Sequence, residues 1–340
     1  MAVAAALAVG LIVGLVVGWS GKAHAEACGP APKAGVGSAD EWLGRIHEEP
    51  DNISVLVDNG VGGVAERRGD EQQPIASAVK VVHLAAYARA VAAGTLDPQE
   101  RVPVAEWERW YLPGTDGGAH EHARSRLPGD SVTIAEMVSA MIRESDNATP
   151  DYLRNRLGDQ ALIDAAAAGG WQGFVPPSLL GMMIRLSEPG VDAWAAAQRY
   201  ANDPLYRVAV QSRPIPSFDA QLAWVETTHA ASARQLTALH RSLATGAFGA
   251  GADIARAQLE WQEPPAGYAA IGFKGGSLVG VLTDAIYLRR TDGTVATAVL
   301  LNRRMPGETW LAAMKELREQ ELLFQAMVEP AALAQLTCAL

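Results

Sequence analysis

The stretch YAAIGFKGGSLVGVLTDAIYLRRTDGTVATAVLLNRRM, residues 268–305, decides the fold of this chain. It contains three successive runs rich in β-branched and aromatic residues, which are typical of strands. The turn signal TDG at residues 291–293 separates the last two runs and predicts a hairpin. Strands joined by hairpins run antiparallel, so this part of the chain predicts an antiparallel sheet.

Elements on both sides extend this sheet. Residues 53–60, ISVLVDNG, and residues 61–67, VGGVAER, predict a second hairpin. An amphipathic helix is expected before it at residues 39–49, and a final helix at residues 308–328. The order of helix, two strands, many helices, three strands and helix predicts an α+β fold. In this fold an antiparallel sheet is flanked by N- and C-terminal helices and carries an inserted all-helical domain.

The domain boundaries follow from this order. We expect a catalytic domain at residues 39–335, with its α/β part at about 39–75 and 228–335 and its helical part at about 76–227. Residues 201–226 contain prolines and show no clear period, which predicts a long loop inside the helical part.

The N-terminal sequence MAVAAALAVGLIVGLVVGWSGKAHA predicts export. Residues 1–25 combine an apolar run with small residues at Ala23 and Ala25, as in a signal peptide with its cleavage site. A Gly/Pro/Ala-rich tether follows at residues 26–38. The alternative is an uncleaved membrane anchor, since about 17 apolar residues suffice to span a bilayer.

Composition limits the partners and cofactors. A net charge of −10 argues against nucleic-acid binding, which requires clustered Lys and Arg. His120 and His122 could chelate a metal, but two loop imidazoles alone make a weak site. We therefore expect a monomer without metal or cofactor, with membrane contact only if the N-terminal segment stays uncleaved.

In an exported chain Cys28 and Cys338 favour a disulfide, and two unpaired thiols are the alternative.

The helix PIASAVKVVHLAAYARAVAAGTLD, residues 74–97, carries the first chemical motif. Ser77 and Lys80 are three positions apart, so on a helix their side chains face the same way. They are either a helix cap and a surface charge or a nucleophile and the base that activates it.

Two further motifs follow in order. S-D-N at residues 145–147 comes directly after a predicted helix, whose Thr133 and Glu136 indicate a capping box at its start. K-G-G-S at residues 274–277 lies on a predicted strand of the sheet. Taken singly, these residues could be an ordinary helix end and a strand bulge.

Taken together, the three motifs resemble the S-x-x-K, S-D-N and K-T-G set of the penicillin-recognising serine hydrolases, with class A β-lactamases as the most similar group. TIAEMVSAMIRESDNATPDYLRNRLG and GFKGGSLVGVLTDAIYL follow the family pattern for most of their length. The resemblance covers about residues 40–330 and is poor over residues 159–226. It implies the β-lactamase/transpeptidase-like fold.

The resemblance also implies the residues that perform acylation. Ser77 would be the nucleophile and Lys80 the base that takes its proton. Ser145 would relay a proton to the leaving nitrogen. Lys80 can act as a base only when it is neutral, and burial and a nearby cation such as Lys274 both lower the pKa of a lysine.

The substrate-binding positions implied by the family are Asn147, Lys274, Gly276 and Ser277. Asn147 would hold Lys80 and the side-chain amide of the substrate, and Lys274 would anchor the substrate carboxylate. The backbone N–H groups of Ser77 and Ser277 would form the oxyanion hole.

Two departures from the family pattern bear on turnover. Gly275 replaces the hydroxyl residue of the third motif. In addition, the family glutamate that activates water for deacylation has no recognisable counterpart between Leu157 and Thr228. The acidic residues in that segment are Asp159, Asp164, Glu188, Asp192, Asp203, Asp219 and Glu226.

Three functions are consistent with these observations. The first is a secreted serine acyl hydrolase that resembles class A β-lactamases and acts on β-lactam-type amides. The second is a D-Ala-D-Ala peptidase or esterase of the same superfamily with slow deacylation, acting on cell-wall peptide or another acyl substrate. The third is a wall-binding module with little turnover, which the retained Ser77, Lys80, Ser145 and Lys274 argue against.

Overall fold

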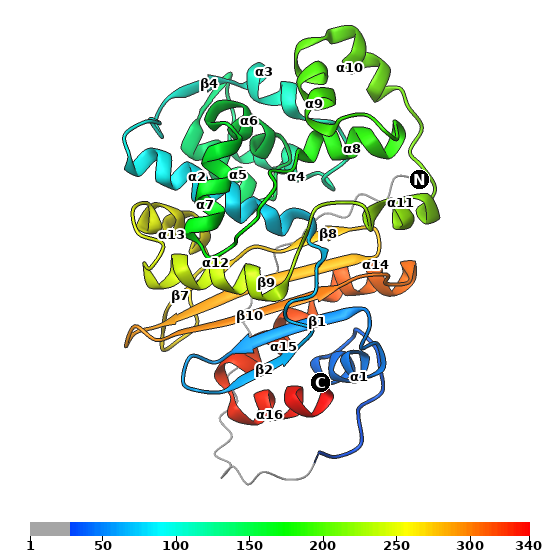
Figure 1. Cartoon of the computed structure of the whole chain (residues 1–340), viewed down its shortest axis with the longest axis vertical. Coiled ribbons are helices and arrows are strands. Elements are labelled where there is room, and N and C mark those ends of the chain that lie inside the picture. Colours follow the sequence, from blue (N-terminus) through cyan, green and yellow to red (C-terminus); the bar gives the residue numbers. More distant parts are fainter. Residues whose placement is uncertain (1–27) are drawn as a thin grey trace. The chain divides into compact units, whose positions relative to one another are not determined.

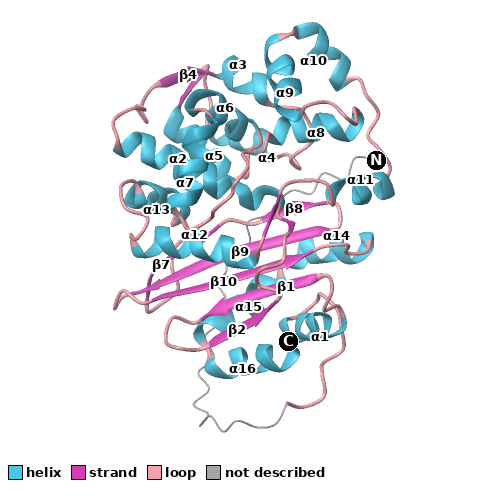
Figure 2. Ribbon diagram, in the orientation of Figure 1, coloured by secondary structure: helices cyan, strands magenta, loops and turns pink. Residues whose placement is uncertain are grey.

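A computed structural model describes residues 28–340, so the predicted signal peptide lies outside the described residues. The described chain divides into two compact units (Figures 1 and 2). The sheet unit contains residues 28–78, 230–245 and 262–340, and the helical unit contains residues 79–229 and 246–261. The predicted α+β class, with an antiparallel sheet and a helical insertion, is confirmed.

The sheet unit is built on six antiparallel strands. Their order is β2 (Val64–Arg67), β1 (Ile53–Asp58), β10 (Val295–Asn302), β9 (Val281–Arg290) and β7 (Tyr268–Phe273), with β8 (Gly276–Leu278) paired to β9. Both predicted hairpins form, since β1 pairs with β2 and β9 pairs with β10. All eight residues of β10 are buried, as expected for a central strand covered on both faces.

Helices cover both faces of this sheet. α12 (Ala233–Thr245) packs on the face that carries Thr297, whose hydroxyl lies 3.3 Å from the Arg241 guanidinium. Side chains alternate between the faces of a strand, so Asp284, paired with Leu300, points to the opposite face. There α15 (Arg318–Val328) contacts the sheet, and its Gln320 donates to Asp284. α1 (Ala39–Glu48) packs against α15.

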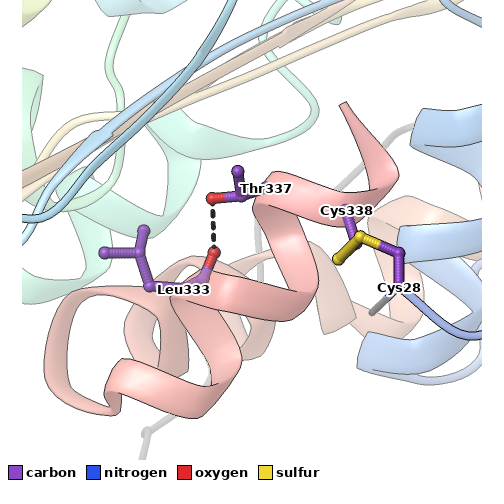
Figure 3. The surroundings of a disulfide bond; sticks show 4 residues. All are labelled: Cys28, Leu333, Thr337 and Cys338. Carbon is purple, nitrogen blue, oxygen red and sulfur yellow. Dashed lines mark hydrogen bonds between the residues drawn. A yellow bond between two sulfur atoms is a disulfide. The ribbon is translucent and has the colours of Figure 1, made fainter. Parts of the chain in front are cut away.

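The two ends of the described chain are joined. Cys28 and Cys338 form a disulfide with their Cα atoms 5.5 Å apart (Figure 3). Cys338 lies on α16 (Pro330–Ala339), which packs against α1 and α15. The Arg67 guanidinium of β2 donates to the last carbonyls, 2.6 Å from Ala339 O and 3.0 Å from Leu340 O. A covalent bond and hydrogen bonds therefore both hold the C-terminus on the sheet unit.

The helical unit surrounds α2 (Lys80–Ala92). Residues 80–88 are all buried, as expected for an apolar helix that other helices enclose. A short ladder pairs β4 (Arg101–Pro103) with β5 (Ser131–Thr133). The other helices are α3 (Val104–Trp107), α4 (Ala119–Arg126), α5 (Ile134–Arg143), α6 (Ala148–Leu157), α7 (Asp159–Ala168), α8 (Leu179–Ser187), α9 (Ala193–Asn202), α10 (Pro204–Gln211), α11 (Phe218–Val225) and α13 (Ala252–Leu259), with the 3₁₀ turn η2 (Glu108–Trp110).

Two sequence predictions are wrong in detail. The loop expected at 201–226 contains α10 and α11, because Asp203 accepts hydrogen bonds from the first turn of α10 and Pro204 occupies its first position. The one helix expected at residues 308–328 is two helices, α14 (Gly307–Glu316) and α15. They are separated at Leu317, whose left-handed backbone has a φ of 51°. α16 then follows α15.

Within residues 28–340, no single helix is long and apolar enough to cross a membrane. Taken together, α15 and α16 are long and apolar enough by length and composition alone, but the two helices are bent by 120° relative to each other.

Candidate active site

Lys80 is the first residue of α2, and its ammonium group is buried in the helical unit. Its Nζ donates to Ser145 O at 2.5 Å, to Ser145 Oγ at 3.1 Å and to Asn147 Oδ1 at 2.7 Å. Burial lowers the pKa of Lys80 to about 8, against the opposing charges of Asp146, Asp116 and Asp151. A substantial fraction of this amine is therefore neutral near pH 8, as a general base requires.

The S-D-N turn between α5 and α6 supplies all three of these acceptors. Ser145 follows the C-terminal end of α5 with a φ of 70°, a left-handed conformation that few non-glycine residues adopt. This reversal gives Lys80 both the carbonyl and the hydroxyl of one residue. Strained backbone of this kind persists where the surrounding contacts fix it, often at functional sites.

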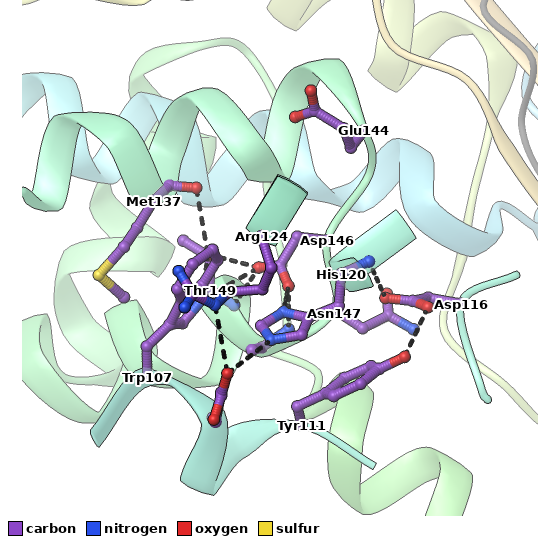
Figure 4. A network of polar contacts seen from close by, with 12 residues as sticks. Trp107, Tyr111, Asp116, His120, Arg124, Met137, Glu144, Asp146, Asn147 and Thr149 are labelled. Carbon is purple, nitrogen blue, oxygen red and sulfur yellow. Dashed lines mark hydrogen bonds and ion pairs between the residues drawn. The ribbon is translucent and has the colours of Figure 1, made fainter. Parts of the chain in front are cut away.

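Asp146 connects the S-D-N turn to the helices packed around it (Figure 4). Its carboxylate is fully buried and accepts from Ala148 N at 3.2 Å and from Thr149 N at 2.8 Å, at the start of α6. Trp107 Nε1 donates from 3.3 Å, and His120 Nδ1 lies 2.6 Å from Asp146 Oδ1. The turn that holds Lys80 is thus anchored to α6, α3 and α4.

Ser77 lies in the sheet unit, in the 3₁₀ turn η1 (Ala76–Val79) that leads directly into α2. Residues 73–88 are all buried except Ser77, which is partly exposed. Ala76, directly before it, has a φ of 46°, a left-handed conformation that ends β3 (Gln73–Pro74) and starts the turn. The backbone thus presents this serine at a surface.

Gly276 on β8 lies against the backbone of this turn. A Cβ atom at Gly276 would be 2.5 Å from Ser77 N and 2.6 Å from Ile75 O, so only glycine permits this close approach. The predicted substrate-binding position Gly276 and the predicted nucleophile Ser77 are thus neighbours in the sheet unit.

Two further predicted residues flank Gly276. Lys274 is buried, and its Nζ donates to Gly275 O at 2.7 Å. The Ser277 hydroxyl donates to Val281 O at 3.0 Å and accepts from Trp310 Nε1 at 2.9 Å. These two contacts hold the side chain of Ser277 within the sheet unit.

Most acidic residues of the 157–228 segment have local structural partners. Glu188 accepts from Tyr206 Oη at 2.8 Å and pairs with Arg213 at 2.6 Å, and these hydrogen bonds hold its pKa below the usual range. Asp192 caps α9, and Asp203 caps α10. Asp159 pairs with Arg154 at 2.7 Å.

The structure brings Lys80, Ser145 and Asn147 together in the helical unit. In the sheet unit it places Gly276 against Ser77, with Lys274 and Ser277 beside it in the chain. Two contributions were not predicted from the sequence: Asp146 anchors the turn that holds Lys80, and His120, considered only as a weak metal ligand, contacts Asp146. Among residues 28–340, no group of three or more His, Cys, Asp or Glu side chains could hold a metal ion.

A family model matches most of this sequence. The model of the β-lactamase enzyme family matches residues 44–319, which is most of the chain. None of the curated proteins matches the sequence.

Solved structures with the same fold have low sequence identity. A β-lactamase from Sphaerobacter thermophilus is 17% identical with a TM-score of 0.57, over 86% of this chain and 98% of that chain. The class A β-lactamase of the last common ancestor of Gram-negative bacteria is 17% identical with a TM-score of 0.52, over 83% and 99%. PBP-A is 18% identical with a TM-score of 0.51, over 85% and 98%. These likenesses establish the fold, and the family match establishes that the chain belongs to the β-lactamase enzyme family, as a serine hydrolase.

Proposed function

We propose that this protein is an exported serine acyl hydrolase whose Ser77 is acylated by β-lactam-type amides. The observation that carries the proposal is the buried Lys80, hydrogen-bonded to Ser145 and Asn147 three residues after Ser77. A surface charge or a helix cap has no need of such an environment, whereas a lysine base does.

Acylation begins when the neutral Lys80 amine takes the proton of the Ser77 hydroxyl. The serine oxygen then attacks the amide carbonyl, and the N–H groups of Ser77 and Ser277 stabilise the oxyanion. Ser145, whose Oγ lies 3.1 Å from Lys80 Nζ, passes that proton to the leaving nitrogen. The C–N bond breaks, and the acyl group remains on Ser77.

Substrate recognition is assigned to the predicted binding residues. Asn147 holds Lys80 through its Oδ1. Its Nδ2 donates one hydrogen to Thr115 O at 3.5 Å, and the second hydrogen is assigned to a substrate carbonyl. Lys274 supplies the positive charge for the substrate carboxylate. With Gly275 in place of a hydroxyl residue, the carboxylate has one hydrogen-bond donor fewer than the family pattern provides.

Deacylation is the step in which this chain departs from its family. The segment 157–228 has no recognisable glutamate motif and folds into the helices α7 to α11, and its Glu188 is engaged by Tyr206 and Arg213. This favours slow release of the acyl group. The second candidate function, a D-Ala-D-Ala peptidase or esterase of the same superfamily, rests on this observation.

Intact-mass spectrometry over a time course tests both points. After mixing with a penicillin, wild-type protein should gain the mass of one penicillin within minutes and retain it for much longer. Ser77→Ala should show no adduct, whereas Ser242→Ala, a helix serine bonded to Leu239 O in the same unit, should behave as wild type.

Each outcome distinguishes the candidates. An adduct that persists in Ser77→Ala would rule out this nucleophile. Rapid loss of the adduct would show that a water-activating base exists, and Glu226→Gln would be the first variant to examine. Adducts with D-Ala-D-Ala peptides or activated esters but not with penicillin would favour the second candidate.

Export is inferred from residues 1–25 and is supported by the Cys28–Cys338 disulfide, since disulfides persist in oxidising compartments. The expected partner is a small-molecule or cell-wall peptide acyl substrate, and the protein is expected to be a monomer.

A further inference from the structure

The acylation chemistry above assigns no part to His120, although this imidazole lies directly behind the S-D-N turn. His120 is on α4 and is 3% exposed. Its ring stacks on Tyr111 with 4.2 Å between the centroids and meets the edge of Trp107 at 4.7 Å. Its Nδ1 lies 2.6 Å from Asp146 Oδ1 (Figure 4).

The hydrogen bonds indicate that this contact is an ion pair. Asp146 also accepts from Thr149 Oγ1 at 2.5 Å, in addition to two backbone N–H groups and Trp107. Burial raises the pKa of Asp146, but the hydrogen bond and charge of His120 and the bonds from Thr149 outweigh it and lower the pKa. A carboxylate with this many donors stays ionised.

The groups around His120 favour its protonated form. Burial lowers the pKa of His120, but the hydrogen bond and charge of Asp146 and the charges of Asp116 and Glu108 outweigh it and raise the pKa. Glu108 Oε1 lies 3.9 Å from His120 Nε2 and also pairs with Arg124 at 3.3 Å. Asp116 accepts from the backbone N–H of His120 at 3.1 Å.

These contacts connect His120 to Lys80 in two ways. The turn that Asp146 anchors carries Ser145 and Asn147, which accept hydrogen bonds from Lys80. In addition, the negative charge of Asp146 raises the pKa of Lys80 and so opposes the neutral amine. A positive charge on His120 offsets that effect.

We propose that His120, as an imidazolium bonded to Asp146, is a positioning residue: it holds the S-D-N turn against Lys80 and offsets the carboxylate charge that would keep Lys80 protonated. The effect on acylation rests on the function proposed above, whereas the effect on Lys80 itself does not.

The test compares His120→Asn with His120→Ala. The asparagine amide can keep an N–H donor near the position of Nδ1 but carries no charge, whereas alanine removes both. His122→Asn, at an exposed position two residues along the same helix, is the matched control. Two readouts are followed with pH: the NMR signal of the Lys80 side chain, labelled at its ε-carbon, and the rate of adduct formation with a penicillin.

In His120→Asn the Lys80 midpoint should rise by on the order of one pH unit, which is the effect of one uncompensated charge at several ångströms. Acylation at pH 7 should then fall about tenfold and recover at high pH. His120→Ala should in addition acylate more slowly at every pH, because the turn loses its anchor. His122→Asn should match wild type in both readouts.

The proposal would be overturned if His120→Asn left two quantities unchanged: the midpoint of the Lys80 NMR titration and the rise of the acylation rate with pH. If that variant fails to fold, the wild-type protein still decides the matter. Its His120 imidazole should lose its proton at a higher pH than an ordinary histidine, and a midpoint at or below the ordinary value contradicts the ion pair. If wild type forms no adduct at all, the proposed function fails. The NMR titrations of Lys80 and of the His120 imidazole still test the role of His120.

Discussion

At the scale of single residues, the candidate site depends on a lysine that the fold keeps out of water. Lys80 is fully buried, yet it is surrounded by acceptors from the S-D-N turn and by the charges of Asp146, Asp116 and Asp151. Burial favours the neutral amine, and those carboxylates favour the ammonium. The resulting balance leaves the pKa at about 8, where the residue can both take and return a proton.

This balance predicts the pH dependence of acylation. A lysine base works in its neutral form, so the rate of adduct formation should rise with pH through a midpoint of about 8. Lys80→Arg keeps the charge but cannot give up its proton, and should acylate about 10²–10⁴-fold more slowly. Rates can be followed with a fluorescent penicillin, with the exposed Lys315→Arg as the control. A rate that is flat between pH 6 and 9 would contradict the part given to Lys80.

Residue motifs were predictable where they are local in the chain. Ser77 and Lys80 are one helical turn apart, and S-D-N is contiguous, so both are visible in the sequence. The pair of His120 and Asp146 joins residues 26 positions apart and follows no periodic pattern. Only the packing of α4 against the S-D-N turn brings those two together, which is why the sequence analysis missed it.

At the scale of secondary-structure elements, β9 and α15 meet through buried carboxyl groups. Asp284 and Glu319 are 1% and 0% exposed, and Gln320 Nε2 donates to Asp284 Oδ1 at 3.1 Å. Burial raises the pKa of Asp284 to about 7, against the hydrogen bond from Gln320 and the charge of Lys274. Burial and the charge of Asp284 together raise the pKa of Glu319.

These shifts predict that stability falls as pH rises. The folded state keeps protons that the unfolded chain releases near pH 4, so stability is lost between about pH 4 and 7. Asp284→Asn should therefore be more stable than wild type at pH 8 by on the order of 2–4 kcal/mol, and much less so at pH 4. Urea unfolding at a series of pH values measures this, with the exposed Glu263→Gln as the control. A constant difference across that range would refute the assignment.

The elements themselves were predictable where local chemistry marks them. Thr133 and Glu136 form the expected capping box of α5, and both sheet hairpins form as predicted. The signal for α10, Asp203 followed by Pro204, was present but was outweighed by the absence of a clear period. The break at Leu317 had no such signal, because a leucine with φ of 51° is held by its surroundings rather than by its own preference.

At the scale of the whole molecule, one covalent bond joins residues that are 310 positions apart. Closing so long a loop restricts the unfolded chain and should stabilise the protein by about 5 kcal/mol on the chain-entropy model. The double variant Cys28→Ser, Cys338→Ser should unfold at a lower temperature than oxidised wild type. Reductant should lower the wild-type midpoint to that of the variant and leave the variant unchanged. Two reactive thiols in the unreduced, denatured protein would show that the bond is absent.

That bond also determines how the chain carries mechanical load. The disulfide closes residues 28–338 into one covalent ring, and Ala339 and Leu340 follow that ring in the chain. Tension applied between the two ends is therefore borne by the sulfur–sulfur bond and not by the hydrogen bonds of the sheet. If an N-terminal segment is anchored in a membrane or wall, pulling on it transmits force into α16, and the strands and the candidate site within the ring remain unloaded.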